Sequence, residues 1–388
     1  MNKNVWILTF AQALMTSCAS LVVFSGSLIG NQLATDPKLS TLPLALIIIG
    51  TATTSIPIAM MMKQFGRKLI FLCVCVFGVI MAIAITVSII SASFIAFCIF
   101  TFLIGGTMAA VQQFRFAAME SVSEELIPKA ASQVLLGGIA AAFIGPEIAV
   151  RGKDLLSQEY AGSFPILGML YVLAFLILSQ YQNVGKQVTT SSNDQRSLGQ
   201  IAKQPLFWVA VIGAMVGYSI MSFIMTATPI SMHVMDGHSL DDTKWVIQSH
   251  IVSMFLPSLF TGWIIKQIGI IRMMLVGLVA YSMCLIIAFL GHEFMNYWIS
   301  LILLGIGWNF LFIGGTTLLP RIYKTSERFK VQALNEFMVF GVQAIASISA
   351  GWVLFQLGWQ SMLLITIPMI ALQIGVIIYW TASNKQQT

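Results

Sequence analysis

The sequence predicts an all-α integral membrane protein with twelve transmembrane helices in two six-helix halves. Three observations carry this prediction. Long apolar runs follow one another along the chain, basic residues gather in alternate loops, and one short loop motif occurs twice. Of the 388 residues, 58% are hydrophobic and only 9% are charged. That is too little charge to coat the surface of a soluble domain of this size.

The apolar runs have the length that a helix needs to cross the hydrocarbon core of a bilayer, roughly 20 residues. The predicted spans are 5–28, 42–62, 69–90, 94–118, 130–150, 162–179, 206–230, 245–265, 273–290, 297–319, 333–355 and 361–380. Between the sixth and seventh spans lies the longest polar stretch. We therefore expect an N-terminal six-helix bundle at 1–180, a cytoplasmic linker at 181–205 and a C-terminal bundle at 206–388.

Lysine and arginine in the loops indicate the orientation, because loops rich in them stay in the cytoplasm. If the N-terminus is cytoplasmic, all but five of the Lys and Arg residues lie in inner loops. Arg115 lies within a span, and the other four lie in outer loops. The outer ones are Lys38, Arg151, Lys153 and Lys244. Both termini should therefore be cytoplasmic, in a bacterial inner membrane. The net charge of +6 reflects this topology, and no nucleic-acid partner is expected.

An internal repeat supports the division into halves. Lys63-Gln64-Phe65-Gly66 follows the second span, and Lys266-Gln267-Ile268-Gly269 follows the eighth. A short match at equivalent topological places is typical of transporters built from two related halves.

This organisation resembles the major facilitator superfamily, in particular a bacterial branch without assigned substrates. The family's signature after the second helix is G-x-x-x-D-R-x-G-R-K, and residues 59–68 read A-M-M-M-K-Q-F-G-R-K. Gly66, Arg67 and Lys68 fit, whereas Lys63 and Gln64 replace the acid and the arginine. The resemblance implies secondary transport by alternating access, with an altered charge network in this loop.

Two further stretches are similar to family patterns. The motif G-x-x-x-G-P-x-x-G of antiporter fifth helices is matched in part by Gly137, Ala141 and Gly145-Pro146. Small residues on one face allow a neighbouring helix to approach, and Pro146 permits a bend. Residues 305–317 look like the tenth helix of the same bacterial branch, with flavin and siderophore permeases as candidate relatives.

Polar and aromatic residues inside the spans are the candidates for substrate binding. A guanidinium beside amides, Arg115 and Gln112, could hold an anionic or amide-rich substrate. The alternative is that Arg115 snorkels to the interface or pairs with Glu120. The other candidates would form a partly aromatic, partly amide cavity for a flat organic molecule, or else ordinary helix packing. They are Gln12, Tyr218, Ser222, His250, Trp308 and Asn309.

Three ionisable residues are candidates for proton coupling or for gates. Glu147 follows the Gly145-Pro146 bend, so its exposure could change during transport, and Arg151 lies four residues on. The simpler interpretation is an interfacial Glu147–Arg151 ion pair that closes an outer gate or fixes the helix. If protons drive transport, Glu147 is the predicted carrier. For Glu336, a gate salt bridge and proton carriage are both open.

The sequence therefore predicts a monomeric, proton-coupled exporter of a small organic solute. An uptake permease for a metabolite, cofactor or siderophore is the first alternative, and a non-transporting scaffold or receptor is the second. No Walker loop, G-x-S-x-G or H-E-x-x-H motif occurs, so no enzyme activity is expected. No cofactor is expected, and the segment from His233 to His238 is better explained as an exposed loop than as a metal site.

The topology can be tested by cysteine labelling in a background without native cysteines. A cysteine at Ser191 should be shielded from an impermeant reagent in intact cells, and one at Asp242 should react. Labelling of the Ser191 position from outside would contradict the orientation.

Overall fold

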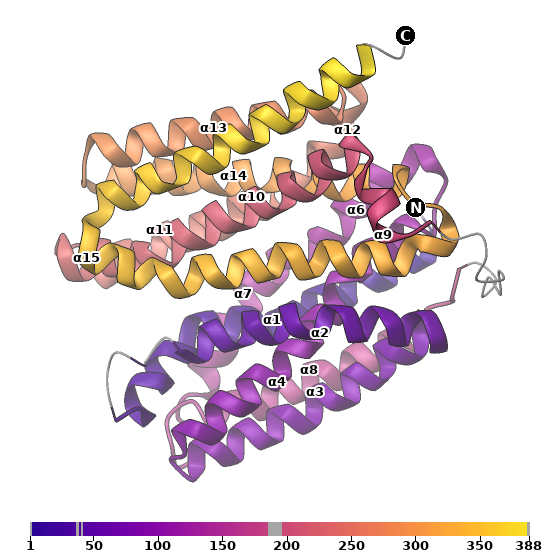
Figure 1. Cartoon of the computed structure of the whole chain (residues 1–388). Helices are drawn as coiled ribbons and strands as arrows, with labels where there is room; N and C mark the ends of the chain where they lie inside the picture. The colour runs from indigo at the N-terminus through magenta and orange to yellow at the C-terminus, as the bar shows by residue number, and fades with distance from the viewer. Residues whose placement is uncertain (1, 36–38, 40–41, 185–195, 386–388) are drawn as a thin grey trace. The chain divides into compact units, whose positions relative to one another are not determined.

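Every regular element that the structure describes is a helix (Figure 1). The computed structural model describes residues 2–35, 39, 42–184 and 196–385. Residues 185–195, which form much of the predicted linker, lie outside the described residues, as does Lys38 of the outer loops.

The chain divides into two units. The first comprises Met1–Thr189 together with Gln332–Phe337, and the second comprises Thr190–Val331 and Met338–Thr388. The first junction falls inside the predicted linker. The inclusion of Gln332–Phe337 in the first unit was not predicted, because this segment lies at the start of the eleventh predicted span.

The first unit contains the helices of the N-terminal part of the chain, which runs from indigo to magenta in Figure 1. They are α1 (Lys3–Leu33), α2 (Leu42–Phe65), α3 (Arg67–Ile90), α4 (Phe94–Gln112), α5 (Phe114–Met119), the short η2 (Glu124–Leu126), α6 (Ile127–Leu135), α7 (Gly137–Gly152) and α8 (Ser163–Leu178). The helix pairs α2–α4, α1–α7 and α3–α8 make the most extensive contacts within this unit.

Glycines bring two of these helix pairs unusually close. A Cβ on Gly50 would lie 2.0 Å from the carbonyl oxygen of Phe102, and one on Gly105 would lie 2.3 Å from that of Ile47. On α7, a Cβ on Gly145 would lie 2.5 Å from the Cβ of Ser20 on α1. The small residues expected on one face of the fifth span therefore do admit a neighbouring helix.

The second unit is built mainly around α14, which packs against α10, α11 and α13. Its elements are α9 (Leu198–Ala202), α10 (Pro205–Pro229), the π-helical η4 (Ile230–Met235), α11 (Leu240–Phe255), α12 (Ser258–Ile268), α13 (Ile270–Leu290), α14 (Phe294–Leu318), the short η5 (Leu319–Arg321) and η6 (Thr325–Glu327), and α15 (Arg328–Lys385) apart from its segment Gln332–Phe337. Figure 1 shows α15 turning sharply between its orange and yellow parts. The turn occurs at Gly358, which has φ of 81° and ψ of 168° and separates two helices.

Within the described ranges, nine helices are long and apolar enough to cross a membrane, or up to ten if α11 and α12 form one bent span. The sixth predicted span corresponds to α8, a shorter apolar helix. The eleventh and twelfth predicted spans together form α15, on either side of Gly358. The structure is thus an all-α membrane protein, and its helices are consistent with the predicted twelve spans.

The repeated loop motif adopts the same backbone conformation in both units. Gly66 joins α2 to α3 with φ of 82°, and Gly269 joins α12 to α13 with φ of 84°. Residues with a side chain rarely adopt this left-handed region, so glycine allows the tight turn between consecutive helices. The two halves therefore share this turn in geometry as well as in sequence.

The close α2–α4 approach predicts a strong effect of one added methyl group. Gly105→Ala should destabilise the protein by about 1–3 kcal/mol, because the helices must separate to accommodate the Cβ. Gly375→Ala is the matched control, since nothing lies within 4 Å of a Cβ at that position. Melting temperatures of the purified proteins measure the difference, and equal values for both variants would contradict the packing.

Candidate functional site

Arg67, at the start of α3, pairs with a carboxylate from another helix, although Lys63 replaces the acidic residue of the family motif in its own loop. Its Nε donates to Glu120 Oε2 at 3.0 Å and its Nη2 donates to Glu120 Oε1 at 2.7 Å, which makes a bidentate ion pair. Nη1 donates to Gln113 Oε1 at 3.2 Å, and Nη2 also donates to Gln332 Oε1 at 2.8 Å. The Arg67 side chain is buried. The altered loop thus keeps a charge network, with its carboxylate supplied from the end of α5.

Arg115 on α5 pairs with Glu336, a partner that the sequence analysis did not name for it. Nη2 of Arg115 donates to Glu336 Oε1, and Nη1 donates to Gln112 Oε1 at 2.6 Å. Asn335 Nδ2 also donates to Glu336 Oε1, at 2.8 Å. Both charged side chains are almost completely buried within the first unit. Removing either partner would leave a buried charge uncompensated, which typically costs about 3–5 kcal/mol.

Glu147 and Arg151 form the ion pair expected from their spacing, with Arg151 Nε donating to Glu147 Oε1 at 2.6 Å. Their side chains are 58% and 75% exposed. An exposed pair four residues apart on one helix contributes little to stability. This environment favours the interfacial ion pair over a buried proton site.

A cluster of aromatic rings occupies the second unit. Tyr218 on α10 contacts the rings of Trp308, Phe312 and Phe340 edge-on, with centroids 5.2, 4.9 and 5.2 Å away. Trp308 also stacks on Phe312 at 5.0 Å and meets Phe255 edge-on at 5.6 Å. Two sequence-predicted binding residues, Tyr218 and Trp308, thus lie in contact. We call these five residues the aromatic cluster.

A polar seam continues from the aromatic cluster along α10 and α15. One turn after Tyr218, Ser222 Oγ accepts a hydrogen bond from Gln343 Nε2 at 2.8 Å. One turn further, the hydroxyls of Thr226 and Ser347 lie 3.5 Å apart. Polar pairs between apolar helices help to fix their register, and the Gln343–Ser222 pair is buried.

Asn309 and His250, two further candidates, have local structural partners. Asn309 Nδ2 donates to the carbonyl of Met254 and to Ser258 Oγ, both at 2.7 Å. These groups flank the bend between α11 and α12, so Asn309 satisfies polar groups that the bend exposes. His250 Nδ1 lies 2.8 Å from the carbonyl of Leu301, which makes Nδ1 the protonated nitrogen and Nε2 an acceptor.

The remaining first-unit candidate, Gln12 on α1, is buried. Gln12, Gln112 and Arg115 thus belong to the first unit, and Tyr218, Ser222, His250, Trp308 and Asn309 belong to the second. Sequence reasoning did not select Phe340, and it named Glu120 only as a possible partner of Arg115. Gln343 carried a usable signal, because it is a polar residue inside an apolar run.

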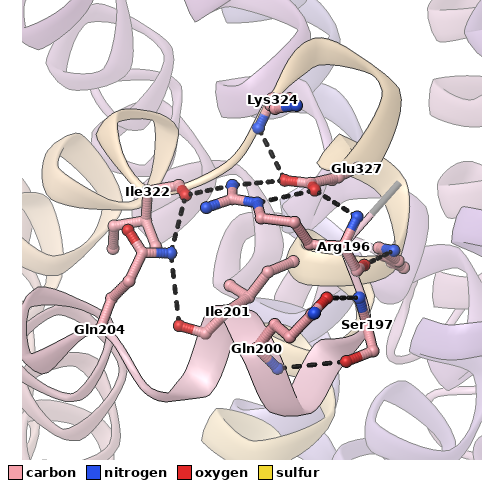
Figure 2. Close-up of polar contacts among 9 residues, drawn as sticks. Arg196, Ser197, Gln200, Ile201, Gln204, Ile322, Lys324 and Glu327 are labelled. Carbon is pink, nitrogen blue, oxygen red and sulfur yellow. Dashed lines mark hydrogen bonds and ion pairs between the residues drawn. The ribbon is translucent and has the colours of Figure 1, made fainter. Parts of the chain in front are cut away.

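The last part of the predicted linker, from Arg196 to Gln204, is bonded to the connection between α14 and α15 outside the spans (Figure 2). Arg196 Nε and Nη2 donate to Glu327 Oε1 and Oε2 at 2.9 and 2.6 Å, and Nη2 also donates to the carbonyl of Ile322 at 2.9 Å. Lys330 Nζ donates to the carbonyl of Arg196, and Gln204 Nε2 donates to that of Ile322. The Glu327 carboxylate raises the pKa of Arg196. These bonds tie the approach to α10 to the connection between α14 and α15.

The histidines at the far end of α10 are engaged in a hydrogen-bonded network. Asp236 Oδ2 accepts from His292 Nδ1 at 2.9 Å and from Tyr297 at 2.6 Å, and His238 Nε2 lies 2.7 Å from the carbonyl of His292. Within the described part of the chain, no group of three or more His, Cys, Asp or Glu residues could hold a metal ion.

The comparisons with known proteins agree with this architecture. The model of the Major Facilitator Superfamily matches residues 231–387. The chain is also 37% identical, over 96% of its length and 94% of the other protein, to a protein of Brucella anthropi named riboflavin transporter RfnT. The chain therefore belongs to the major facilitator superfamily and is a membrane transporter, not an enzyme.

Solved structures show the same fold at low sequence identity. The human organic anion transporter MFSD10 superposes with a TM-score of 0.78 and 10% identity, covering 97% of this chain and 99% of that one. A bacterial homologue of the iron transporter ferroportin gives 0.74 and 14%, covering 98% and 100%. These likenesses concern the fold alone.

Proposed function

We propose that this chain is an uptake permease for riboflavin or a closely related flavin. The observation that carries the proposal is the similarity to the riboflavin transporter of Brucella anthropi, which extends over nearly the whole of both chains. This proposal follows the alternative of cofactor uptake rather than the export that the fifth-helix motif suggested.

The composition of the second unit supports a flat, partly polar substrate. The flavin ring system is planar and aromatic, and it carries carbonyls, ring nitrogens and one imide N–H. Aromatic side chains stack on such rings, and a few amide or hydroxyl groups can orient them. The aromatic cluster, with the Ser222–Gln343 pair one turn away, provides both kinds of group.

Riboflavin uptake can be measured directly. A riboflavin-auxotrophic bacterial strain without a flavin importer should grow on low external riboflavin when it expresses this chain. It should also accumulate radiolabelled riboflavin faster than cells with an empty vector.

Cells preloaded with labelled riboflavin provide the opposite test. Faster loss of label from expressing cells, without accumulation, would show export and contradict uptake. The absence of flavin movement in either direction, at normal expression, would contradict flavin as the substrate.

We further propose that Glu336, rather than Glu147, couples transport to protons. A coupling carboxylate must alternate between a charged and a neutral state, and burial makes this equilibrium sensitive to its partners. Glu336 is fully buried and pairs with Arg115, whereas Glu147 is largely exposed. Within the described structure, Glu336 Oε2 has no hydrogen-bond partner, so it can receive a proton without breaking another bond.

Matched glutamine variants separate the two carboxylates. In reconstituted vesicles with an imposed pH gradient, Glu336→Gln should lose riboflavin accumulation but still exchange riboflavin across the membrane. Glu147→Gln should accumulate riboflavin like the wild type, because the exposed Glu147–Arg151 ion pair contributes little to stability. Full accumulation by Glu336→Gln would remove Glu336 as the proton carrier, and loss in Glu147→Gln alone would assign that role to Glu147.

A further inference from the structure

Gln343 presents an unused hydrogen-bond acceptor next to the aromatic cluster. The residue is only 9% exposed, and its Nε2 donates to Ser222 Oγ at 2.8 Å. Its Oε1 is buried and has no hydrogen-bond partner among the described residues. A buried acceptor without a partner typically costs about 1–3 kcal/mol, so a role in binding is a physical reason for its presence.

Gln343 lies one helical turn from members of the aromatic cluster on both helices that hold it. Phe340, one turn earlier on α15, contacts Tyr218, and Ser222, one turn after Tyr218 on α10, holds the amide of Gln343. The hydrogen bond to Ser222 fixes the orientation of the amide and leaves its oxygen available.

A second unused group, a donor rather than an acceptor, lies in the aromatic cluster itself. Trp308 is 1% exposed, and its indole Nε1–H is buried without a hydrogen-bond partner in the described structure. The indole nitrogen can only donate, and the oxygen of Gln343 can only accept. The aromatic cluster and Gln343 together therefore offer one donor and one acceptor beside aromatic rings.

This combination matches one edge of the flavin ring. The pyrimidine half of that ring carries an imide N–H, called N3–H, between two carbonyl groups. An acceptor is needed opposite N3–H, and a donor is needed opposite a neighbouring carbonyl.

We propose that Gln343 is a specificity-determining residue that recognises this imide edge. Its Oε1 accepts the hydrogen bond from N3–H, and Trp308 Nε1–H donates to an adjacent carbonyl while the rings of the cluster pack against the flavin. The inference rests on the proposed flavin transport and assigns the substrate class as planar ring systems with an imide N–H.

A second buried glutamine serves as the matched control. Gln373 on α15 also has a buried Oε1 without a partner, and its Nε2 donates to the carbonyl of Val209 at 3.3 Å. It lies beside Gly213 and Met274 rather than beside the aromatic cluster. Gln343 and Gln373 are thus both buried with an unpartnered Oε1, and they differ in whether they lie near the aromatic cluster.

The test compares two ligands on three proteins. Riboflavin and 3-methylriboflavin, which lacks N3–H, are titrated into the purified full-length wild type, Gln343→Met and Gln373→Met. Quenching of flavin fluorescence reports the dissociation constant. Methionine approximates the length of glutamine but cannot accept a comparable hydrogen bond.

The expected result is selective for the ligand with the N–H. Gln343→Met should weaken riboflavin binding by about tenfold, the typical effect of one lost hydrogen bond, and leave 3-methylriboflavin binding unchanged. Gln373→Met should change neither ligand's dissociation constant selectively.

Two other results overturn the inference in distinguishable ways. If Gln343→Met leaves riboflavin binding unchanged, or weakens both flavins equally, Gln343 does not recognise N3–H, although flavin transport stands. If the wild type binds neither flavin, the proposed function fails together with the inference.

Discussion

The absence of hydrogen-bond partners in the bilayer interior constrains this whole structure. Every backbone polar group that crosses the membrane must be satisfied within the protein, and a helix satisfies nearly all of them within one segment. Where a helix is interrupted, a side chain from another helix hydrogen-bonds to the backbone groups that the interruption leaves unsatisfied. Asn309 does so at the bend between α11 and α12, where it donates to the carbonyl of Met254.

The same constraint separates the charged residues into two kinds. Arg67 and Arg115 are buried, and each has a carboxylate and at least one amide around its guanidinium. Glu147 and Arg151 are exposed and have a simple pair along one helix. Buried charges need such a partner because an isolated one is costly, so the arrangement of their partners is the most informative electrostatic feature of the chain.

Aromatic packing and polar satisfaction have to be considered together in the second unit. The stacked and edge-on rings around Tyr218 are sufficiently explained by packing alone. The unsatisfied groups of Trp308 and Gln343 are not explained by packing, because an apolar side chain of similar size would fill the same space without that cost. The unsatisfied atoms, rather than the rings, therefore carry the argument for a binding role.

The sequence by itself determined the helical membrane fold and the repeated glycine turn, because apolar length and backbone conformation are local properties. It also placed Glu147 and Arg151 together, since their spacing on one helix is enough. Only the tertiary structure decided that Arg67 pairs with Glu120 and that Arg115 pairs with Glu336, partners that are 53 and 221 residues away. It likewise decided that Gln343 bonds to Ser222, one turn after Tyr218. Long-range partners depend on which helix faces pack together, and the period of a single helix does not contain that information.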